Sequence, residues 1–316
     1  MKKIIAFFFI VYSISSFSQR KYSQQFSILN DNDLYISTVQ DRYYTNGLFL
    51  SYDYLSNKRD NYLLKRIYKI QIGQKMYSPY KANVSSLSEH DRPFAAYLYG
   101  GFGMRNFYAN NTSIQLSGEI GILGPSAKGQ ELMNFIHDIY GFNRADGWKY
   151  QIKDAFAFNF SADYTKHINA ISNKNFDVNW KNTLNVGTVF TDLSTGFLSR
   201  FGVQSLSSFS NSIAFNSNLN DDNSKSYNNS EFFFFINPML RYTLYDATIQ
   251  GSFLHDNNTV TYDVRPFVLT TTAGLQFTAN RFNFGFSVTH HTRKLDNDLV
   301  PNSNFYGSIL LNYQFN

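Results

Sequence analysis

Three polar clusters in the first half of the chain carry the side chains that could do chemistry. The first joins Asn32-Asp33 to the run Asp41-Arg42-Tyr43-Tyr44-Thr45-Asn46-Gly47, the second is Asp91-Arg92-Pro93, and the third surrounds His137. Each cluster interrupts stretches in which apolar and polar residues alternate. Polar groups gathered at such a junction are either solvated or bind a ligand. The arrangement of the flanking elements shows whether the clusters lie close enough together to form one binding site.

The residue types in these clusters suit the hydrolysis of an ester. A histidine side chain can take a proton from water near neutral pH, which makes His137 a candidate general base. Asp33 offers the hard carboxylate oxygens that calcium prefers, and a calcium ion would polarise an ester carbonyl and stabilise the oxyanion. Thr45 and Asn46 could position a water molecule or the carbonyl. The residues alone leave a structural alternative open, because a lone histidine is more often structural and Asn, Asp and Gly are ordinary turn residues.

The composition favours a transmembrane β-barrel over a large soluble β protein. The 316 residues include 32 Phe, 23 Tyr and no Cys, and aromatic residues make up 18% of the chain. Mean hydropathy is slightly negative, and no internal segment reaches the roughly 20 apolar residues that a spanning helix requires. Strands of a membrane barrel alternate lipid-facing and lumen-facing side chains, so they need no long apolar run.

The amino terminus has the pattern of a secretory signal peptide, residues 1–18, ahead of a barrel domain at 19–316. Lys2-Lys3 provide a charged start, residues 4–12 an apolar segment and residues 13–18 a small-residue end. A buried first helix is the alternative. Export of a chain without cysteine excludes disulfides and thiol chemistry, and the aromatic carboxyl terminus indicates a Gram-negative outer membrane. The formal charge of +5 falls to about +3 without the leader, which is too small to argue for nucleic acid.

Period-2 alternation predicts twelve antiparallel strands. They are residues 23–29, 47–56, 66–75, 94–105, 112–123, 155–167, 176–190, 196–205, 231–242, 265–278, 281–291 and 304–315. Because the chain is expected to start in the periplasm, the junctions after odd-numbered strands face outward. These outer loops are residues 30–46, 76–93, 124–154, 191–195, 246–264 and 292–303, and the three polar clusters lie in the first three. The segment 207–230 is long for the periplasmic side, so it is either a disordered excursion or hides a missed pair of strands.

The third outer loop contains the helix that the sequence predicts, residues 126–140. Pro125 precedes it, Ser126 is expected to cap it and Gly141 to end it. An apolar stripe, beside which His137 lies, consists of Leu132, Phe135, Ile136 and Ile139. A short amphipathic helix of this kind can lie against the barrel mouth and wall off a site.

Two further groups have open interpretations. Adjacent residues of a strand point to opposite faces, so His290 and His291 cannot both bind one metal ion. With the neighbouring Arg293 and Lys294 they form a solvated rim or meet anionic lipid headgroups. Asp91-Arg92-Pro93 is either an ion pair that fixes a loop entrance or part of a phosphate-binding rim.

Taken in order along the chain, the motifs resemble those of the lipid A 3′-O-deacylase family (LpxR). The residues that carry the resemblance are Asn32-Asp33, Asp41-Arg42-Tyr43-Tyr44-Thr45-Asn46-Gly47, Tyr77-Ser78-Pro79, Asp91-Arg92-Pro93-Phe94-Ala95, Gly124-Pro125-Ser126-Ala127, Gly129-Gln130-Glu131, Asn134, His137, Gly147-Trp148 and Gln151. They cover residues 26 to about 154, and the remainder matches only as a barrel pattern. The resemblance implies a twelve-stranded antiparallel outer-membrane barrel with a short helix in the third extracellular loop. It also implies a calcium-dependent esterase that releases the 3′-linked acyl chain of lipid A.

By matching position, the resemblance implies roles for four residues. His137 would be the general base that activates water, and Asp33 would help to hold calcium. Asn32 and Thr45 would orient the substrate or the oxyanion. The substrate would be lipid A or lipopolysaccharide in the outer membrane, and the active site would face the outer leaflet, with no nucleic acid involved and no protein partner required.

The chain departs from the family pattern at three places. Val84-Ser85 stand where a family member carries Lys-Arg, Met133 where it carries glutamine, and Asn143 where it carries glutamate. The contacts to substrate phosphates and the acyl position therefore stay open. Two alternatives also remain: a non-enzymatic outer-membrane barrel, such as a pore or an adhesin, and a phospholipase on the same scaffold.

Overall fold

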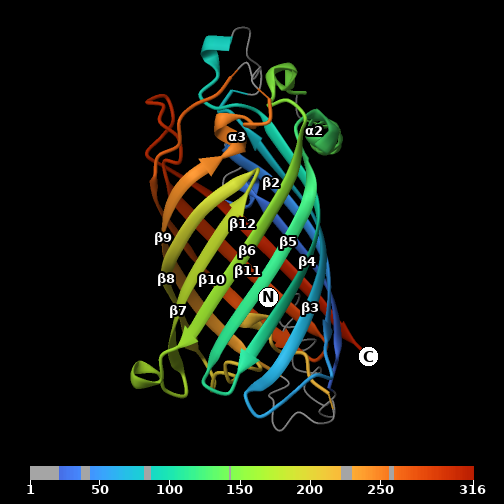
Figure 1. Ribbon diagram of the computed structural model, residues 1–316, viewed down its shortest axis with the longest axis vertical. Helices are drawn as coiled ribbons and strands as arrows, with labels where there is room; N and C mark the ends of the chain where they lie inside the picture. The colour runs from blue at the N-terminus through green and yellow to red at the C-terminus, as the bar shows by residue number, and fades with distance from the viewer. Residues whose placement is uncertain (1–20, 37–42, 82–86, 142–143, 222–229, 256–259) are drawn as a thin grey trace, which may run out of the picture.

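The computed structural model describes residues 21–36, 43–81, 87–141, 144–221, 230–255 and 260–316. Within these ranges the chain forms a closed barrel of twelve antiparallel strands, and β1 closes the ring against β12 (Figure 1). The strands are β1 Gln24–Asn32, β2 Tyr43–Leu55, β3 Leu63–Ser78, β4 Ala95–Tyr108, β5 Thr112–Leu123, β6 Ala155–His167, β7 Phe176–Gly187, β8 Phe190–Gly202, β9 Phe232–Asp246, β10 Phe267–Ala279, β11 Phe282–Thr292 and β12 Ser303–Phe315. The predicted fold class is confirmed.

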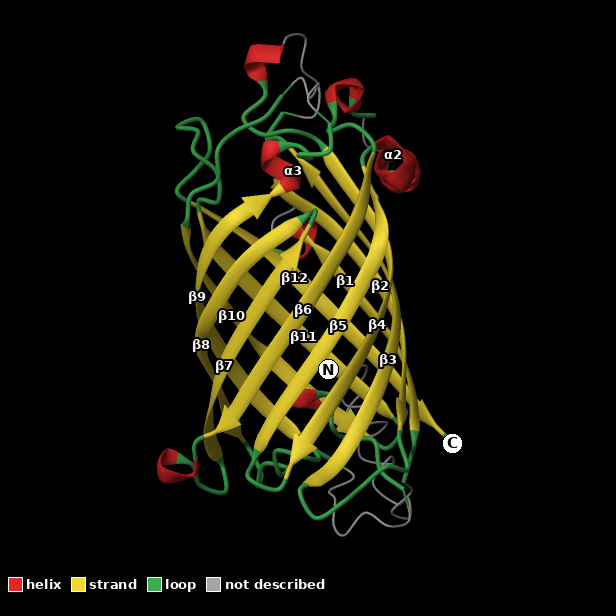
Figure 2. Cartoon of the chain, viewed as in Figure 1, coloured by secondary structure: helices red, strands yellow, loops and turns green. Residues whose placement is uncertain are grey.

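The two ends of the barrel differ (Figure 2). One end carries helix α2 (Gly129–Tyr140), the four-residue helix α3 (Ala247–Gln250) and most of the longer connections, and we call it the α2 end. β1 starts and β12 finishes at the opposite end, which we call the terminal end. Shorter connections join the strands there, apart from the one between β8 and β9. The signal peptide predicted at residues 1–18 lies outside the described residues.

Side chains alternate between the lumen and the outside of the wall, as the period-2 pattern predicts. On β3, Ile70 and Ile72 are exposed on the outer face, whereas Lys69 and Gln71 point inward and line a luminal cavity. Near the terminal end an outer girdle of aromatic rings, with centroids 5.2 to 6.3 Å apart, runs through Phe315, Tyr52, Tyr54, Tyr68 and Phe102. Such girdles flank the apolar band of outer-membrane barrels. No helix among the described residues has the length and hydropathy to cross a membrane.

The prediction of an outer loop at 191–195 is wrong, because these residues lie inside β8. The chain reverses instead at residues 188–189, between β7 and β8. The side chain of Asp192 points into the lumen, where it accepts a hydrogen bond from Asn185 at 3.1 Å and lies 3.6 Å from the Arg241 guanidinium. A polar lumen can satisfy a carboxylate inside a strand, so polar residues do not by themselves mark a loop in this fold.

The described part of the connection between β8 and β9 is neither a disordered excursion nor a pair of strands. Residues 206–221, which we call the plug segment, fold back into the lumen at the terminal end (Figure 1). Phe209, Phe215 and Leu219 of the plug segment form one buried cluster with inward-facing residues of β2, β3, β4 and β8. The segment therefore adds an apolar core inside the barrel that the strand pattern does not indicate.

Lys65 of β3 holds the plug segment through polar contacts. Its ammonium group donates to the carbonyl oxygens of Ser210 and Ser217, at 2.7 and 2.5 Å. It also donates to the amide oxygens of Asn211 and Asn220, each at 3.0 Å. These oxygens replace the water that a buried ammonium group would lose. A Ser- and Asn-rich segment is typical of a solvated linker, which is why the sequence did not indicate a plug.

Arg200 of β8 ties the plug segment to the wall. Its buried guanidinium donates to Asp177 of β7 (Nε to Oδ1, 3.0 Å), to Glu231 beside β9 (Nη1 to Oε1, 3.0 Å) and to the carbonyl of Ser207 (3.1 Å). The ring of Phe215 lies 4.8 Å from the guanidinium. Two buried carboxylates thus depend on one cation, and charges removed from water need such partners.

Replacement of Arg200 by leucine should destabilise the barrel by about 3–5 kcal/mol, because Asp177 and Glu231 would stay buried without a compensating charge. The measurement is urea unfolding in lipid vesicles followed by tryptophan fluorescence. Arg265→Leu is the matched control, since it removes only an exposed pair with Asp296 (3.1 Å) and should cost less than about 1 kcal/mol. Equal losses in the two variants would contradict the role given to Arg200.

Candidate functional site

The outer face of the wall at the α2 end is polar where β1 finishes and β2 starts. Ile28 of β1 is exposed on the outer face, and the same alternation places Asn32 there. Asn46 is the cross-strand partner of Asn32. It lies two residues before the exposed Leu48 on β2, so it faces outward as well. Both asparagines therefore belong to strands rather than to the loop predicted at 30–46.

A β-bulge brings Thr45 onto this outer face. The pairing of β2 with β3 shifts register at Thr45, so that β2 carries one extra residue there. Tyr44 points into the lumen, where its hydroxyl donates to Asp31 at 2.7 Å. On the outer face, the Thr45 hydroxyl lies 2.5 Å from the hydroxyl of Ser78, and both residues are buried. The bulge thus lets two consecutive residues of β2, Thr45 and Asn46, share the outer face of the wall.

After β1 the chain bends over the outside of the wall. Asn32 caps the 3-10 turn η1 (Asp33–Tyr35), and its Oδ1 accepts a backbone N–H of that turn at 2.8 Å. Tyr35 lies against Gly307, an outward position of β12. Asp33 is 3% exposed in this turn. Its carboxyl group is therefore enclosed at the outer rim, next in the chain to Asn32.

Helix α2 begins later than the sequence predicts. Pro125–Ala127 form the 3-10 turn η3, and the helix starts at Gly129 rather than at 126. The Ser126 hydroxyl and backbone N–H both donate to the Asp154 carboxylate, at 2.8 and 2.7 Å, so the predicted Ser126 cap is wrong. Gly141 ends the helix in the left-handed conformation (φ 73°), as predicted. An acceptor on a distant strand end competes with the helix for the serine, and the local sequence does not reveal it.

Helix α2 lies against the outside of the barrel wall (Figure 2). Gly129 is so close to β4 that a Cβ atom there would come within 2.5 Å of the Ala96 methyl group. One turn along, the buried Met133 sulfur accepts a hydrogen bond from the Trp148 indole at 3.1 Å. Met76 of β3 belongs to the same buried cluster. Since Ala96 and Met76 face outward, α2 covers the wall from outside at one end of β3 and β4.

His137 lies on the buried side of α2, one turn beyond Met133, and is 5% exposed. The wall cluster beneath the helix includes Met76, the cross-strand partner of Asn46. Asn46 in turn pairs with Asn32 across β1 and β2. The structure thus gathers all four predicted site residues on the outer face of the wall at the α2 end. Their catalytic roles stay predictions.

The apolar stripe predicted on α2 lies along one flank of the helix. Leu132 and Ile136 pack partly against the wall cluster, whereas Phe135 and Ile139 are 62% and 64% exposed. Contrary to the expectation from the sequence, His137 is not beside this stripe but on the opposite flank, where the helical period places it. The helix therefore separates a polar side, which includes His137, from an apolar side.

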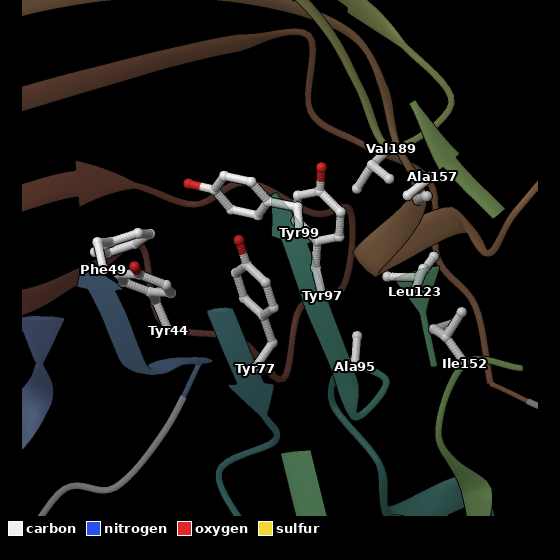
Figure 3. Packing of buried hydrophobic residues seen from close by; sticks show 11 residues of the cluster. Tyr44, Phe49, Tyr77, Ala95, Tyr97, Tyr99, Leu123, Ile152, Ala157 and Val189 are labelled. Carbon is white, nitrogen blue, oxygen red and sulfur yellow. The ribbon is translucent and has the colours of Figure 1, made fainter. Parts of the chain in front are cut away.

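The lumen at the α2 end holds a different set of side chains. A buried cluster there, shown in Figure 3, includes Tyr44, Phe49, Tyr77, Tyr97, Tyr99 and Leu123. It borders a cavity of about 350 Å³ that Lys75, Arg241 and Lys294 help to line. Burial, and then the nearby Arg241, lowers the pKa of Lys294 to about 7. None of the four predicted site residues, all of them described, lines this cavity.

The second polar cluster ties the outer loops together. The Arg92 guanidinium donates to the carbonyl oxygens of Tyr43 and Thr248, both at 3.1 Å. It also lies over the ring of Tyr77 at 4.6 Å, while Asp91 accepts from the Tyr43 hydroxyl at 2.8 Å. Burial lowers the pKa of Arg92. Because Arg92 is buried, these contacts favour the interpretation as support for the loop entrance over a phosphate-binding rim.

The remaining predicted features fall in different places. His290 contacts the ring of Phe305 on the outer face at 4.7 Å, and His291 is buried and lines the luminal cavity, so the two point to opposite faces as predicted. Val84-Ser85 and Asn143 lie outside the described residues. Ser78, whose hydroxyl contacts Thr45, is not among the predicted site residues, although the motif Tyr77-Ser78-Pro79 includes it.

Comparisons with known proteins identify relatives of this chain. A family model described as "Outer membrane protein LpxR" matches residues 4–315. Among solved structures, LpxR from Salmonella typhimurium gives a TM-score of 0.72 at 20% sequence identity, over 92% of this chain and 100% of that chain. The β domain of the Bordetella autotransporter Brka gives a TM-score of 0.46 at 9% identity, over 94% of this chain and 99% of that chain. A comparison with curated protein sequences gave no match.

Replacement of Gly129 by alanine should loosen α2 from the wall, because the new methyl group would meet Ala96 and the Trp148 ring, at 2.5 and 2.7 Å. Overpacking of this kind typically costs about 1–3 kcal/mol. Limited proteolysis of the folded protein in vesicles should then cut the α2 region faster than in the unsubstituted protein. Gly100→Ala on β4 is the control, since nothing lies within 4 Å of its added Cβ. Identical cleavage of both variants would argue against the close packing of α2.

Proposed function

The chain belongs to the LpxR family of outer membrane proteins, and we propose that it is an outer-membrane lipid A deacylase. In this proposal it hydrolyses the 3′-linked acyl ester of lipid A with a water molecule activated by His137. One observation carries the proposal: His137 is buried on the side of α2 that packs against the outside of the wall. The same outer face holds Asn32 and Thr45.

A site on the outer face of the wall can be reached from the bilayer without passage through the lumen. Lipid A would present its ester at the boundary between its acyl chains and its sugar-phosphate part. The acyl chains would lie along exposed apolar side chains of the strands, and the sugar-phosphate part would meet the polar loops at the α2 end. This arrangement requires the α2 end to face the outer leaflet.

Each site residue has a distinct task in the proposed reaction. His137 accepts a proton from the water molecule that attacks the ester carbonyl, and returns a proton to the leaving alcohol. The Asn32 amide oxygen already accepts a hydrogen bond from η1, so its Nδ2 is the group that would donate to the oxyanion. Thr45 orients the carbonyl or the water, with its hydroxyl held against Ser78.

The donor types at the outer rim suit calcium better than a transition metal. Asp33 is a buried carboxylate, and its neighbours at the rim, Asn32 and Thr45, offer oxygen atoms rather than thiolates. The described residues contain no group of three or more His, Cys, Asp or Glu side chains that could hold a metal ion. Backbone carbonyls, water and substrate would therefore complete the roughly six to eight oxygen ligands that calcium takes. When bound, the ion would polarise the ester carbonyl.

The alternatives differ in how well the structure supports them. A pore needs an open lumen, but the plug segment packs into the terminal end and Arg92 ties the outer loops together. A phospholipase would use the same outer-face site and differ only in the lipid it accepts. The assay of the proposed reaction must therefore offer both lipid classes.

His137→Ala should lower the rate of acyl release from lipid A by a factor of about 10² to 10⁴, the usual contribution of a general base. The measurement is mass spectrometry of lipid A after incubation with purified protein, beside a parallel incubation with phospholipid vesicles. His255→Ala, in an exposed position between β9 and β10, should retain the rate of the unsubstituted protein. Equal rates for both variants would remove His137 from the mechanism, and release from phospholipid alone would favour the phospholipase.

Chelation of calcium with EGTA should abolish acyl release, and added calcium should restore it. Asp33→Asn should raise the calcium concentration needed for half-maximal activity by about tenfold or more, because calcium affinity depends on the number of charged ligands. Asp138→Asn is the control, since that exposed carboxylate pairs with Arg144 on the far side of α2. Full activity in EGTA would refute the calcium assignment and leave the role of His137 untouched.

A further inference from the structure

The exposed flank of α2 is an apolar surface that the proposed reaction does not use. Phe135 and Ile139 are four residues apart and so lie on the same side of the helix. Both are large apolar side chains, more than half exposed. The opposite side of α2 is buried against the wall, and the helix as a whole lies outside the barrel. The flank is therefore exposed to the medium that surrounds the barrel at the level of α2.

The flank continues the apolar belt of the wall. Ile122 of β5 packs partly beneath α2, and its cross-strand partner Phe156 on β6 is 61% exposed at the same height. Two residues closer to the terminal end, Ile120 is 59% exposed. On β3 the exposed fraction of the outward side chains rises as sharply, from 1% for Met76 beneath the helix to 60% for Ile72. The lipid-facing surface thus reaches the level of α2.

The two carboxylates of α2 are each paired with a basic residue beside the helix. Glu131 accepts from Lys128 and Asp138 from Arg144, both at 2.8 Å. These partners hold the pKa of both carboxylates below their usual range, so the pairs stay ionised at the solvated side of the helix. An amphipathic helix with one apolar flank and one charged side is typical of the membrane interface.

We propose that α2 is docked in the outer leaflet, with Phe135 and Ile139 in the acyl region, and that this docking sets the depth of His137. The occupant of the flank is bilayer lipid, because the flank is continuous with the lipid-facing belt of an outer membrane protein. His137, on the side of α2 that packs against the wall, is then held at the height of the polar boundary where an acyl ester lies. The depth of His137 matters only if the proposed function holds, whereas the docking itself does not depend on it.

The docking can be measured with single spin labels, since the chain has no cysteine. Phe135→Cys and Ile139→Cys, labelled in lipid vesicles, should resemble Ile120→Cys of the belt and collide more with oxygen than with a water-soluble nickel chelate. Glu131→Cys, on the same helix, should resemble Tyr62→Cys, an exposed position beside the terminal end. Labels at 135 and 139 that are open to the nickel chelate would overturn the docking, and so would labels that are shielded from both reagents, since these would indicate a protein partner or a second copy.

The effect on depth can be separated from effects on folding. Phe135→Ser with Ile139→Ser should lower acyl release from lipid A in bilayers by about tenfold or more, the size expected when large apolar side chains lose their apolar surroundings. The same double variant should leave the rate in detergent micelles unchanged.

The matched control is Phe253→Ser with Leu254→Ser, which removes similar exposed side chains at the α2 end and outside α2; it should leave both rates unchanged. An equal loss in bilayers and micelles would overturn the role in depth, and so would an unchanged rate in bilayers. If the unsubstituted protein releases no acyl chain in either system, the proposed function fails, and the spin-label result still decides the docking.

Discussion

The closed wall of the barrel is the constraint on which the rest of this structure depends. Closure pairs each strand with two neighbours, so backbone groups are satisfied within the wall and side chains can face lipid on one side. The alternation of a strand then assigns each residue to the lumen or to the outside. Asp31 and Asn32 are neighbours in sequence, yet one bonds Tyr44 in the lumen and the other caps a turn on the outer rim. The wall makes two separate chemical environments out of one continuous chain.

The lumen holds contacts that stabilise the barrel. The plug segment brings Phe215 against the buried Arg200, and Lys65 exchanges water for carbonyl and amide oxygens of the same segment. At the opposite end, Arg92 joins the strand end at Tyr43 to helix α3 through Thr248. The interior side chains therefore hold the plug segment and the loops at the α2 end in place. The site proposed for lipid A lies on the outer face instead, where α2 and the bulge at Thr45 gather polar residues.

The sequence could predict most of the barrel and the end of it at which the candidate site residues lie, but not that they share the outer face of the wall. Period-2 alternation predicted twelve strands because lipid and lumen demand opposite side chains at consecutive positions. It failed at Asp192, whose carboxylate finds Asn185 and Arg241 only once β7, β8 and β9 are adjacent. The helix-start pattern failed at Ser126, which bonds Asp154 instead of capping α2. In both cases a distant partner outweighed the local preference.

What the sequence determined by itself was the class of fold, through the alternation, and the set of polar residue types from which a hydrolytic site is proposed. Tertiary structure alone decided that Thr45 and Ser78 meet on the outside of the wall, that α2 covers that face, and that a Ser- and Asn-rich segment fills the lumen. The physical reason is that alternation depends only on neighbouring residues. A bulge, a helix packed at Gly129 and a plug depend on surfaces that exist only after the ring of strands has closed.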